Sequence, residues 1–197
     1  MRIIGGTESG QPLLAPKGFS VRPTLDRVRE AIFNRLAPLI PNARVLDLFS
    51  GTGALGLECV SRGAASVLSV ERSAQHLRYI KQNIRACGYQ PDQIRVHLAC
   101  AFKTIHELAI VAEKFDLILA DPPFGPKTNE NRSESLAQNL IDDSNLIHLS
   151  HSHTLIILSH ATRDKVEIPG PWALEKSQQS GDTTITYLKI TTETPPT

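Results

Sequence analysis

The residues whose types and spacing could do chemistry begin with three glycines that follow a hydrophobic segment. Gly51, Gly53 and Gly56 have the spacing G-x-G-x-x-G directly after residues 45–49. Glycines at these positions permit a tight turn and a close approach of the backbone to a ligand, which then faces the start of a helix. NAD-dependent enzymes also use this pattern, so the glycines alone do not define a reaction.

A second candidate is the carboxylate that ends the next hydrophobic segment. Glu71 follows residues 66–70, and Asp47 lies inside the segment before the glycines. A carboxylate in the position of Glu71 can accept hydrogen bonds from both ribose hydroxyls of an adenosine cofactor. The alternative is a surface charge at the end of a strand. The glycine turn at a suitable separation favours the cofactor role.

The third candidate is the segment Asp121-Pro122-Pro123-Phe124, which follows the hydrophobic residues 115–120. Two consecutive prolines fix the backbone and have no N–H, so their peptide groups offer only carbonyl acceptors. With the Asp121 carboxylate they form a rigid acceptor site suited to an –NH₂ group. Phe124 supplies a flat apolar surface on which a planar base can stack. The alternative is a turn that begins with an aspartate.

Strands alternating with helices must position these residues. Apolar segments predict strands at 45–49, 66–71, 94–98, 115–120 and 155–158, and amphipathic segments predict helices at 54–61, 74–87, 102–111 and 135–140. This alternation is typical of a parallel sheet covered on both faces. We also expect an antiparallel hairpin, residues 172–176 and 184–190, to close the sheet. Ligands bind at the carboxyl ends of such strands, where the candidate residues fall.

The N-terminal part has a different character. Residues 2–23 predict an irregular β arm with a short strand at 2–4, and Thr24 is a suitable N-cap for a helix at 24–36. Through residue 44 the chain has seven basic and three acidic residues. This excess indicates a phosphate-rich partner, although a solvated helix face would explain it equally well. We therefore divide the chain into an N-terminal extension (1–43), a core domain (44–191) and a frayed tail (192–197).

Composition excludes several classes of protein. No apolar run approaches the ~20 residues that a membrane span requires, and no secretory segment begins the chain, so we expect a cytoplasmic protein. Cys59, Cys87 and Cys100 are far apart, which predicts reduced thiols rather than a disulfide framework or zinc site. Three histidines (His148, His151, His153) cluster, but no carboxylate or thiol at a ligand spacing accompanies them, so we predict no metal.

Two longer motifs carry a resemblance to a known family. The S-adenosylmethionine-dependent amino-methyltransferases have motifs that resemble two segments of this chain. These segments are residues 47–58 (DLFSGTGALGLE) and the Asp-Pro-Pro-Phe segment. Residues 1–6 (MRIIGG) and 22–34 (RPTLDRVREAIFN) resemble the bacterial family that methylates guanine N2 in 16S ribosomal RNA, the small-subunit methyltransferase D type. The match spans nearly the whole chain and leaves no room for a separate target-recognition domain. The combination favours methyl transfer over hydride transfer.

The resemblance implies an α/β fold with a Rossmann-like seven-stranded methyltransferase sheet, mostly parallel, with an antiparallel C-terminal strand. It implies catalytic roles for Asp121, Pro122 and Phe124, and contacts of Pro123 and Phe124 with the flipped guanine. It implies that S-adenosylmethionine is held by residues at the strand ends: Asp47, Phe49, Ser50, Gly51, Thr52, Gly53, Glu71, Arg72, Cys100, Ala101 and Asp121. It also implies that basic and polar residues of the N-terminal extension close the site or contact RNA: Arg2, Arg22, Thr24 and Arg27.

One residue departs from the family pattern. The family usually has Asp-Ala after the third strand, where the aspartate reaches the adenine amino group, whereas this chain has Cys100-Ala101. A lost hydrogen bond of this kind costs ~0.5–1.5 kcal/mol in cofactor binding. The expected partner is 16S ribosomal RNA or the small ribosomal subunit, with guanine 966 as the family target, and we expect a monomer. The alternatives are a DNA adenine or protein glutamine methyltransferase, an NAD-dependent oxidoreductase and a non-enzymatic RNA-binding module.

Overall fold

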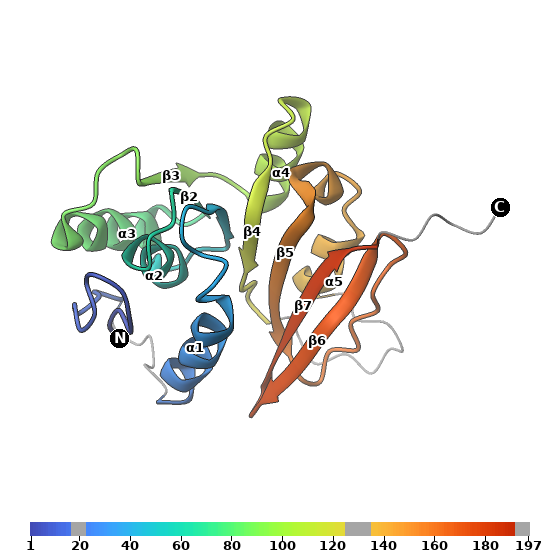
Figure 1. Cartoon of the computed structure of the whole chain (residues 1–197), viewed down its shortest axis with the longest axis horizontal. Coiled ribbons are helices and arrows are strands. Elements are labelled where there is room, and N and C mark those ends of the chain that lie inside the picture. The colour runs from blue at the N-terminus through green and yellow to red at the C-terminus, as the bar shows by residue number, and fades with distance from the viewer. Residues whose placement is uncertain (17–22, 125–134, 192–197) are drawn as a thin grey trace.

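A computed structural model of the 197-residue chain describes residues 1–16, 23–124 and 135–191, without the side chains of residues 23–27. Seven strands form one sheet in the order β3-β2-β1-β4-β5-β7-β6 (Figure 1). β7 runs opposite to the other six strands and pairs antiparallel with β5 and β6, so the expected mostly parallel Rossmann-like sheet is confirmed. The strands are β1 (Arg44–Leu48), β2 (Ser66–Glu71), β3 (Ile94–Leu98), β4 (Phe115–Ala120), β5 (Ser150–Ala161), β6 (Trp172–Ser180) and β7 (Thr183–Ile190).

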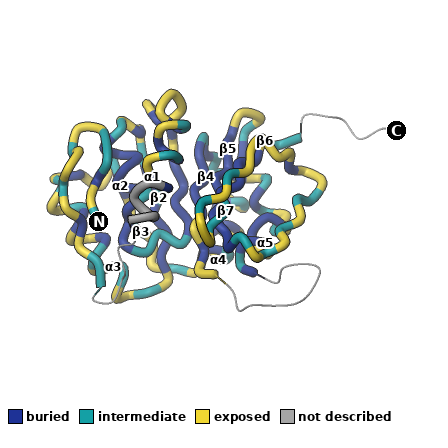
Figure 2. The backbone as a smooth tube through the Cα atoms, turned by 90° about the horizontal axis from the view of Figure 1, so that it is seen from below, coloured by how far each residue is buried: buried dark blue, intermediate teal, exposed yellow. Residues whose placement is uncertain are grey.

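Helices cover both faces of this sheet (Figure 1). One layer contains α1 (Pro23–Leu36), α2 (Ala54–Ser61) and α3 (Ala74–Cys87); the other contains α4 (Ala101–Ile110), α5 (Leu136–Asp142) and a 3₁₀ helix (Leu146–Leu149). Successive side chains of a strand point to opposite faces of the sheet. In the central strands the side chains on both faces are apolar. Val45 and Leu117 pack in the core below α1 and α2, while Leu46 and Ile118 pack in the core below α4 and α5. Figure 2 shows buried segments, in dark blue, along the middle of the molecule.

Several predicted boundaries were wrong. β5 begins at Ser150, five residues before the predicted start. Residues 150–154 are polar and have no strand-like pattern in the sequence, but pairing with β4 stabilises the strand there. β6 continues to Ser180, and its mostly exposed residues show no core-facing alternation from which its length could be read. The predicted strand at 2–4 is a single bridge between Arg2 and Pro12.

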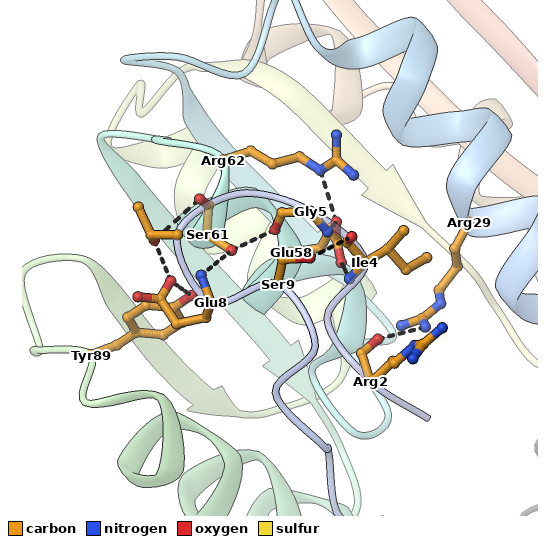
Figure 3. A network of polar contacts seen from close by, with 11 residues as sticks. Arg2, Ile4, Gly5, Glu8, Ser9, Arg29, Glu58, Ser61, Arg62 and Tyr89 are labelled. Carbon is orange, nitrogen blue, oxygen red and sulfur yellow. Dashed lines mark hydrogen bonds and ion pairs between the residues drawn. The ribbon is translucent and has the colours of Figure 1, made fainter.

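The N-terminal arm is fastened to the core by a buried carboxylate (Figure 3). Glu58 on α2 is fully buried, and its oxygens accept hydrogen bonds from the backbone N–H groups of Ile4 (2.7 Å) and Gly5 (2.8 Å). The Arg62 guanidinium, one helical turn later, pairs with the same carboxylate at 2.8 Å. At Gly6 the arm approaches α2 so closely that a Cβ would lie 1.8 Å from the Ser61 carbonyl oxygen. The arm is therefore an integral part of the folded domain.

A buried amide makes the second attachment of the arm. Asn83 on α3 is completely buried; its Oδ1 accepts the Leu14 N–H (2.8 Å) and its Nδ2 donates to the Leu14 carbonyl (3.0 Å). The same Nδ2 donates to the carbonyl of Thr52 in the glycine turn (3.0 Å). One side chain thus joins the arm, α3 and the turn.

We expect the Glu58→Gln substitution to lower the free energy of unfolding by about 3 kcal/mol, because it leaves the partly buried Arg62 without its counter-charge. Denaturant unfolding monitored by circular dichroism measures this difference. The matched control is Glu107→Gln, which removes an exposed ion pair with Lys103 and should change stability by less than about 1 kcal/mol. Equal effects of the two substitutions would contradict the anchoring role.

Candidate functional site

The glycine turn and the Asp-Pro-Pro-Phe segment leave the sheet at the same edge. β1 and β4 are parallel neighbours, and Leu48, the last residue of β1, is paired with Ala120, the last residue of β4. Phe49 and Asp121 therefore begin adjacent loops at the carboxyl ends of these strands. The structure confirms that these two segments lie side by side.

The turn after β1 has the backbone conformation that its glycines predict. Gly51 and Gly53 have φ values of 58° and 81°, in the left-handed region that disfavours other residues. A Cβ on Gly51 would have only the Phe49 carbonyl oxygen nearby, at 4.0 Å, so the turn faces open space there. At Gly56 a Cβ would lie 2.9 Å from Asp47 Oδ2, so this glycine permits close packing of α2 on β1. A ligand can approach the backbone at the first glycine, while the third serves packing.

Glu71, at the end of β2, holds this turn in place. Its Oε2 accepts a hydrogen bond from the Gly51 N–H (2.8 Å), and its Oε1 accepts one from the Ser73 N–H (2.7 Å). Each carboxylate oxygen can accept a second hydrogen bond, so the residue retains acceptor capacity for the hydroxyl groups of a ligand. Glu71 thus supports the turn and is a candidate ligand-binding group.

Asp47 is a buried carboxyl beneath the turn. Its Oδ2 accepts hydrogen bonds from the Gly56 N–H (3.2 Å) and the Ser69 hydroxyl (3.4 Å), while Oδ1 has no partner among the described residues. Burial raises the pKa of Asp47 to about 7, against the lowering by hydrogen bonds with Ser50, Gly56 and Ser69, and the negative charge of Asp121 raises it further. With its side chain buried, Asp47 supports α2 and the turn and does not reach the open side.

Asp121 lies at the open edge of the sheet. The residue is exposed, yet protein atoms crowd its carboxyl group, and this desolvation raises its pKa; a hydrogen bond with Ser159 on β5 acts in the opposite direction. Pro122 is buried, and the Phe124 side chain is exposed. A weakly solvated carboxyl thus lies three residues before an exposed aromatic ring in the same loop. This arrangement can bind an amino group on a planar, aromatic molecule.

The loop after β3 reaches the same edge. The Ala99 N–H donates to the Glu71 carbonyl (3.1 Å), so the exposed Cys100 follows next to the end of β2. Cys100 occupies the N-cap position of α4 without making a side-chain capping bond, and Ala101 is buried. Phe49 of the turn contacts Phe102 edge-to-face, with ring centroids 6.1 Å apart. Arg72 is exposed beside Glu71.

The predicted RNA-contacting residues are only partly described. Arg2 is exposed, and its carbonyl accepts a hydrogen bond from the Arg29 guanidinium (2.8 Å). Arg22 and the side chains of Thr24 and Arg27 lie outside the described residues, so their roles stay predictions.

Sequence reasoning missed two polar residues of this site. Asn83 ties the glycine turn to the arm, and Ser159 contacts Asp121. A signal for Asn83 was present, because it lies three residues after Ile80 on the apolar stripe of its helix, where a polar side chain needs buried partners. Ser159 gave no such signal, because only the register of β5 against β4 brings it to Asp121.

The fold and this site define the chain as a methyltransferase of the Rossmann-like class. The solved structure described as "Putative methyltransferase yhhF from Escherichia coli" superposes with a TM-score of 0.79 at 28% identity, over 98% of this chain and 99% of that one. A second structure, complexed with SAH, has a TM-score of 0.67 at 16% identity over 86% of this chain and 50% of its own, and shows the shared fold.

Sequence comparison identifies the family. The model described as "Conserved hypothetical protein 95" matches residues 1–189. Ribosomal RNA small subunit methyltransferase D of Escherichia coli K12 is 32% identical over 92% of this chain and 85% of that protein. The chain belongs to this small-subunit methyltransferase D family. Within the described residues, no helix is long and apolar enough to cross a membrane.

We expect Asp47→Asn to remove a pH-dependent loss of stability. The pKa of Asp47 is about 7 in the folded state against an ordinary value of 3.8, so the unfolded chain loses this proton first as pH rises. Stability therefore falls between about pH 4 and 7, by on the order of 4 kcal/mol from this residue. Asparagine does not titrate. Urea unfolding at several pH values should show that the free energy of unfolding of the variant rises relative to that of the wild type as pH increases from about 4 to 7. Parallel plots of this free energy against pH would contradict the interpretation.

Proposed function

We propose that this protein is an S-adenosylmethionine-dependent methyltransferase that methylates the exocyclic N2 of a guanine in 16S ribosomal RNA. The observation that supports this most directly is the pairing of Leu48 with Ala120, which sets Asp121 beside the glycine turn. A methyl donor at the turn and an amino group at Asp121 would then be neighbours. Family membership supports ribosomal RNA as the substrate class.

The residues at the strand ends suit this cofactor. The open space at Gly51 would admit the amino-acid part of S-adenosylmethionine close to the backbone. Glu71 would accept hydrogen bonds from the ribose hydroxyls with the acceptor capacity that Gly51 and Ser73 leave. Phe49, Ser50, Thr52, Gly53, Arg72, Cys100 and Ala101 would complete the surroundings. When bound, S-adenosylmethionine supplies an electrophilic methyl group.

Asp121 and the Pro122 carbonyl would bind and orient the target amine. The lone pair of a guanine N2 amine is delocalised into the ring, so the group is a poor nucleophile. Two acceptors for its protons favour a pyramidal nitrogen whose lone pair is free to attack. The weakly solvated Asp121 carboxylate also stabilises the positive charge that develops on this nitrogen. No strong base is required, because the methylated amine is acidic enough to lose its proton afterwards.

Phe124 and the N-terminal extension would hold the RNA. Phe124 is exposed in the same loop as Asp121 and would present an aromatic face on which an extruded guanine can stack. Pro123 lies between them. The exposed Arg2 and the basic segment around Arg22, Thr24 and Arg27 would contact phosphates, which makes binding dependent on salt concentration.

We expect Asp121→Ala to lower the rate of methyl transfer by roughly a hundredfold or more, because the amine loses its orienting and charge-stabilising group. Labelled S-adenosylmethionine is incubated with 16S RNA, small subunits, DNA and protein, and mass spectrometry locates the methyl group. The exposed Asp92→Ala serves as the matched control. Near-normal turnover of Asp121→Ala, label on DNA adenine or protein glutamine, or NAD binding in place of S-adenosylmethionine would overturn the proposal.

We expect Cys100→Asp to strengthen S-adenosylmethionine binding by up to about tenfold, because a carboxylate accepts a hydrogen bond from the adenine amino group far better than a thiol does. Isothermal titration calorimetry measures this affinity. Cys100→Ser is the control: both variants can cap α4 and raise its stability, but only aspartate places a carboxylate there. Equal affinities of the two variants would contradict the adenine contact.

A further inference from the structure

Three potential metal ligands meet at the edge of the sheet opposite to the glycine turn. Asp116 is the second residue of β4, and His151 and His153 lie near the start of β5. The two strands are parallel neighbours, so both contribute their N-terminal ends here. The two histidines are neighbours in the sequence, but Asp116 lies far from them along the chain, so only the fold reveals the carboxylate that completes the cluster.

An irregularity in the sheet brings these side chains together. The pairing of β4 with β5 passes from Phe115 and Ser150 directly to Leu117 and Leu155, so four residues of β5 stand opposite Asp116 alone. Thr154 fixes this bulge, because its hydroxyl donates to the Phe115 carbonyl (2.6 Å) and accepts the His151 N–H (2.7 Å). Bulges of this kind redirect side chains. Here the bulge directs two imidazoles toward one carboxylate.

The ligand atoms are close enough for a single ion. One ligand atom from each of Asp116, His151 and His153 lies within 4.8 Å of the other two. His153 Nε2 is 3.2 Å from Asp116 Oδ1, about the separation of two ligands on a tetrahedral ion with bonds near 2 Å. The imidazoles of His151 and His153 are stacked with centroids 5.0 Å apart and planes 5° from parallel. Because the two rings are stacked, the side chains must rotate before all three ligand atoms point at one centre.

Neighbouring groups orient the carboxylate. Asp116 Oδ2 accepts the Arg44 backbone N–H (2.8 Å), which leaves Oδ1 facing His153, as outer hydrogen bonds do for ligands in metal sites. Two cations lie nearby, but each has its own partner. The Arg44 guanidinium pairs with Glu113 (2.8 Å), and the Lys114 ammonium donates to the Ser150 carbonyl (3.0 Å).

We propose that Asp116, His151 and His153 bind one Zn²⁺ ion. Two imidazoles and one carboxylate suit zinc and its neighbours among the transition metals better than magnesium or calcium, which prefer sites made of oxygen alone. Water completes the fourth position, since the cluster is partly exposed. The ion joins the start of β5 to β4 and stabilises the bulge. This site is separate from the proposed methyl-transfer site, and the proposal replaces our sequence-based expectation that the chain binds no metal.

The test measures Zn²⁺ binding to the 197-residue chain without an affinity tag by isothermal titration calorimetry, with thermal unfolding in parallel. We expect one ion per chain and a melting temperature that rises with ZnCl₂ concentration, since the ion binds the folded state. His151→Ala, His153→Ala and Asp116→Asn should each weaken binding by roughly tenfold or more, as loss of a ligand costs at least as much as loss of an outer contact.

Two controls make the outcome decisive. His148→Ala removes a histidine that precedes the bulge and lies outside the cluster, so its Zn²⁺ affinity should equal that of the wild type. Circular dichroism without metal checks that the variants fold. Retained affinity in the three ligand variants, equal loss in His148→Ala, or no stoichiometric binding by the wild type would each overturn the proposal. None of these results depends on methyl-transfer activity.

Discussion

The parallel pairing of β1 with β4 is the constraint on which the candidate site depends. Because Leu48 and Ala120 are paired and both strands end there, two loops of different chemistry start side by side. One loop exposes backbone for a ligand, and the other presents a carboxylate and an aromatic ring. Buried apolar residues on both faces of the sheet fix this register, because a shift by one residue would exchange the two cores.

Buried polar side chains hold the loops to this frame. Glu58 binds the backbone of the arm, Glu71 binds the glycine turn, and Asp47 binds the start of α2. In each case a carboxylate accepts backbone N–H groups that would otherwise lack partners in the interior. Burial raises the pKa of Asp47 to about 7, and the hydrogen bonds that it accepts come from neutral groups, whereas the Arg62 guanidinium pairs with Glu58.

The sequence predicted the central part of the fold well, because there local pattern and tertiary packing agree. The strands through residue 120 and the glycine turn follow from apolar runs and glycine spacing. The sequence-based prediction failed where the pairing of distant strands determines the structure. Sheet register determines the early start of β5, and it also brings Ser159 to Asp121 and Asp116 to His153. The arm was predicted as a contact surface for RNA, yet hydrogen bonds of Gly5 and Leu14 attach much of it to the core.

The bridge made by Asn83 has a thermodynamic consequence for the molecule. The same amide nitrogen donates to Leu14 in the arm and to Thr52 in the turn. When either segment becomes ordered, the Asn83 side chain is therefore already held in the position in which it binds the other segment. We therefore expect a ligand that rigidifies the turn to slow exchange of amide hydrogens in the arm as well, because one side chain holds both segments. Amide exchange in the N-terminal segment would then depend on whether the binding site is occupied, although this segment lies outside the site.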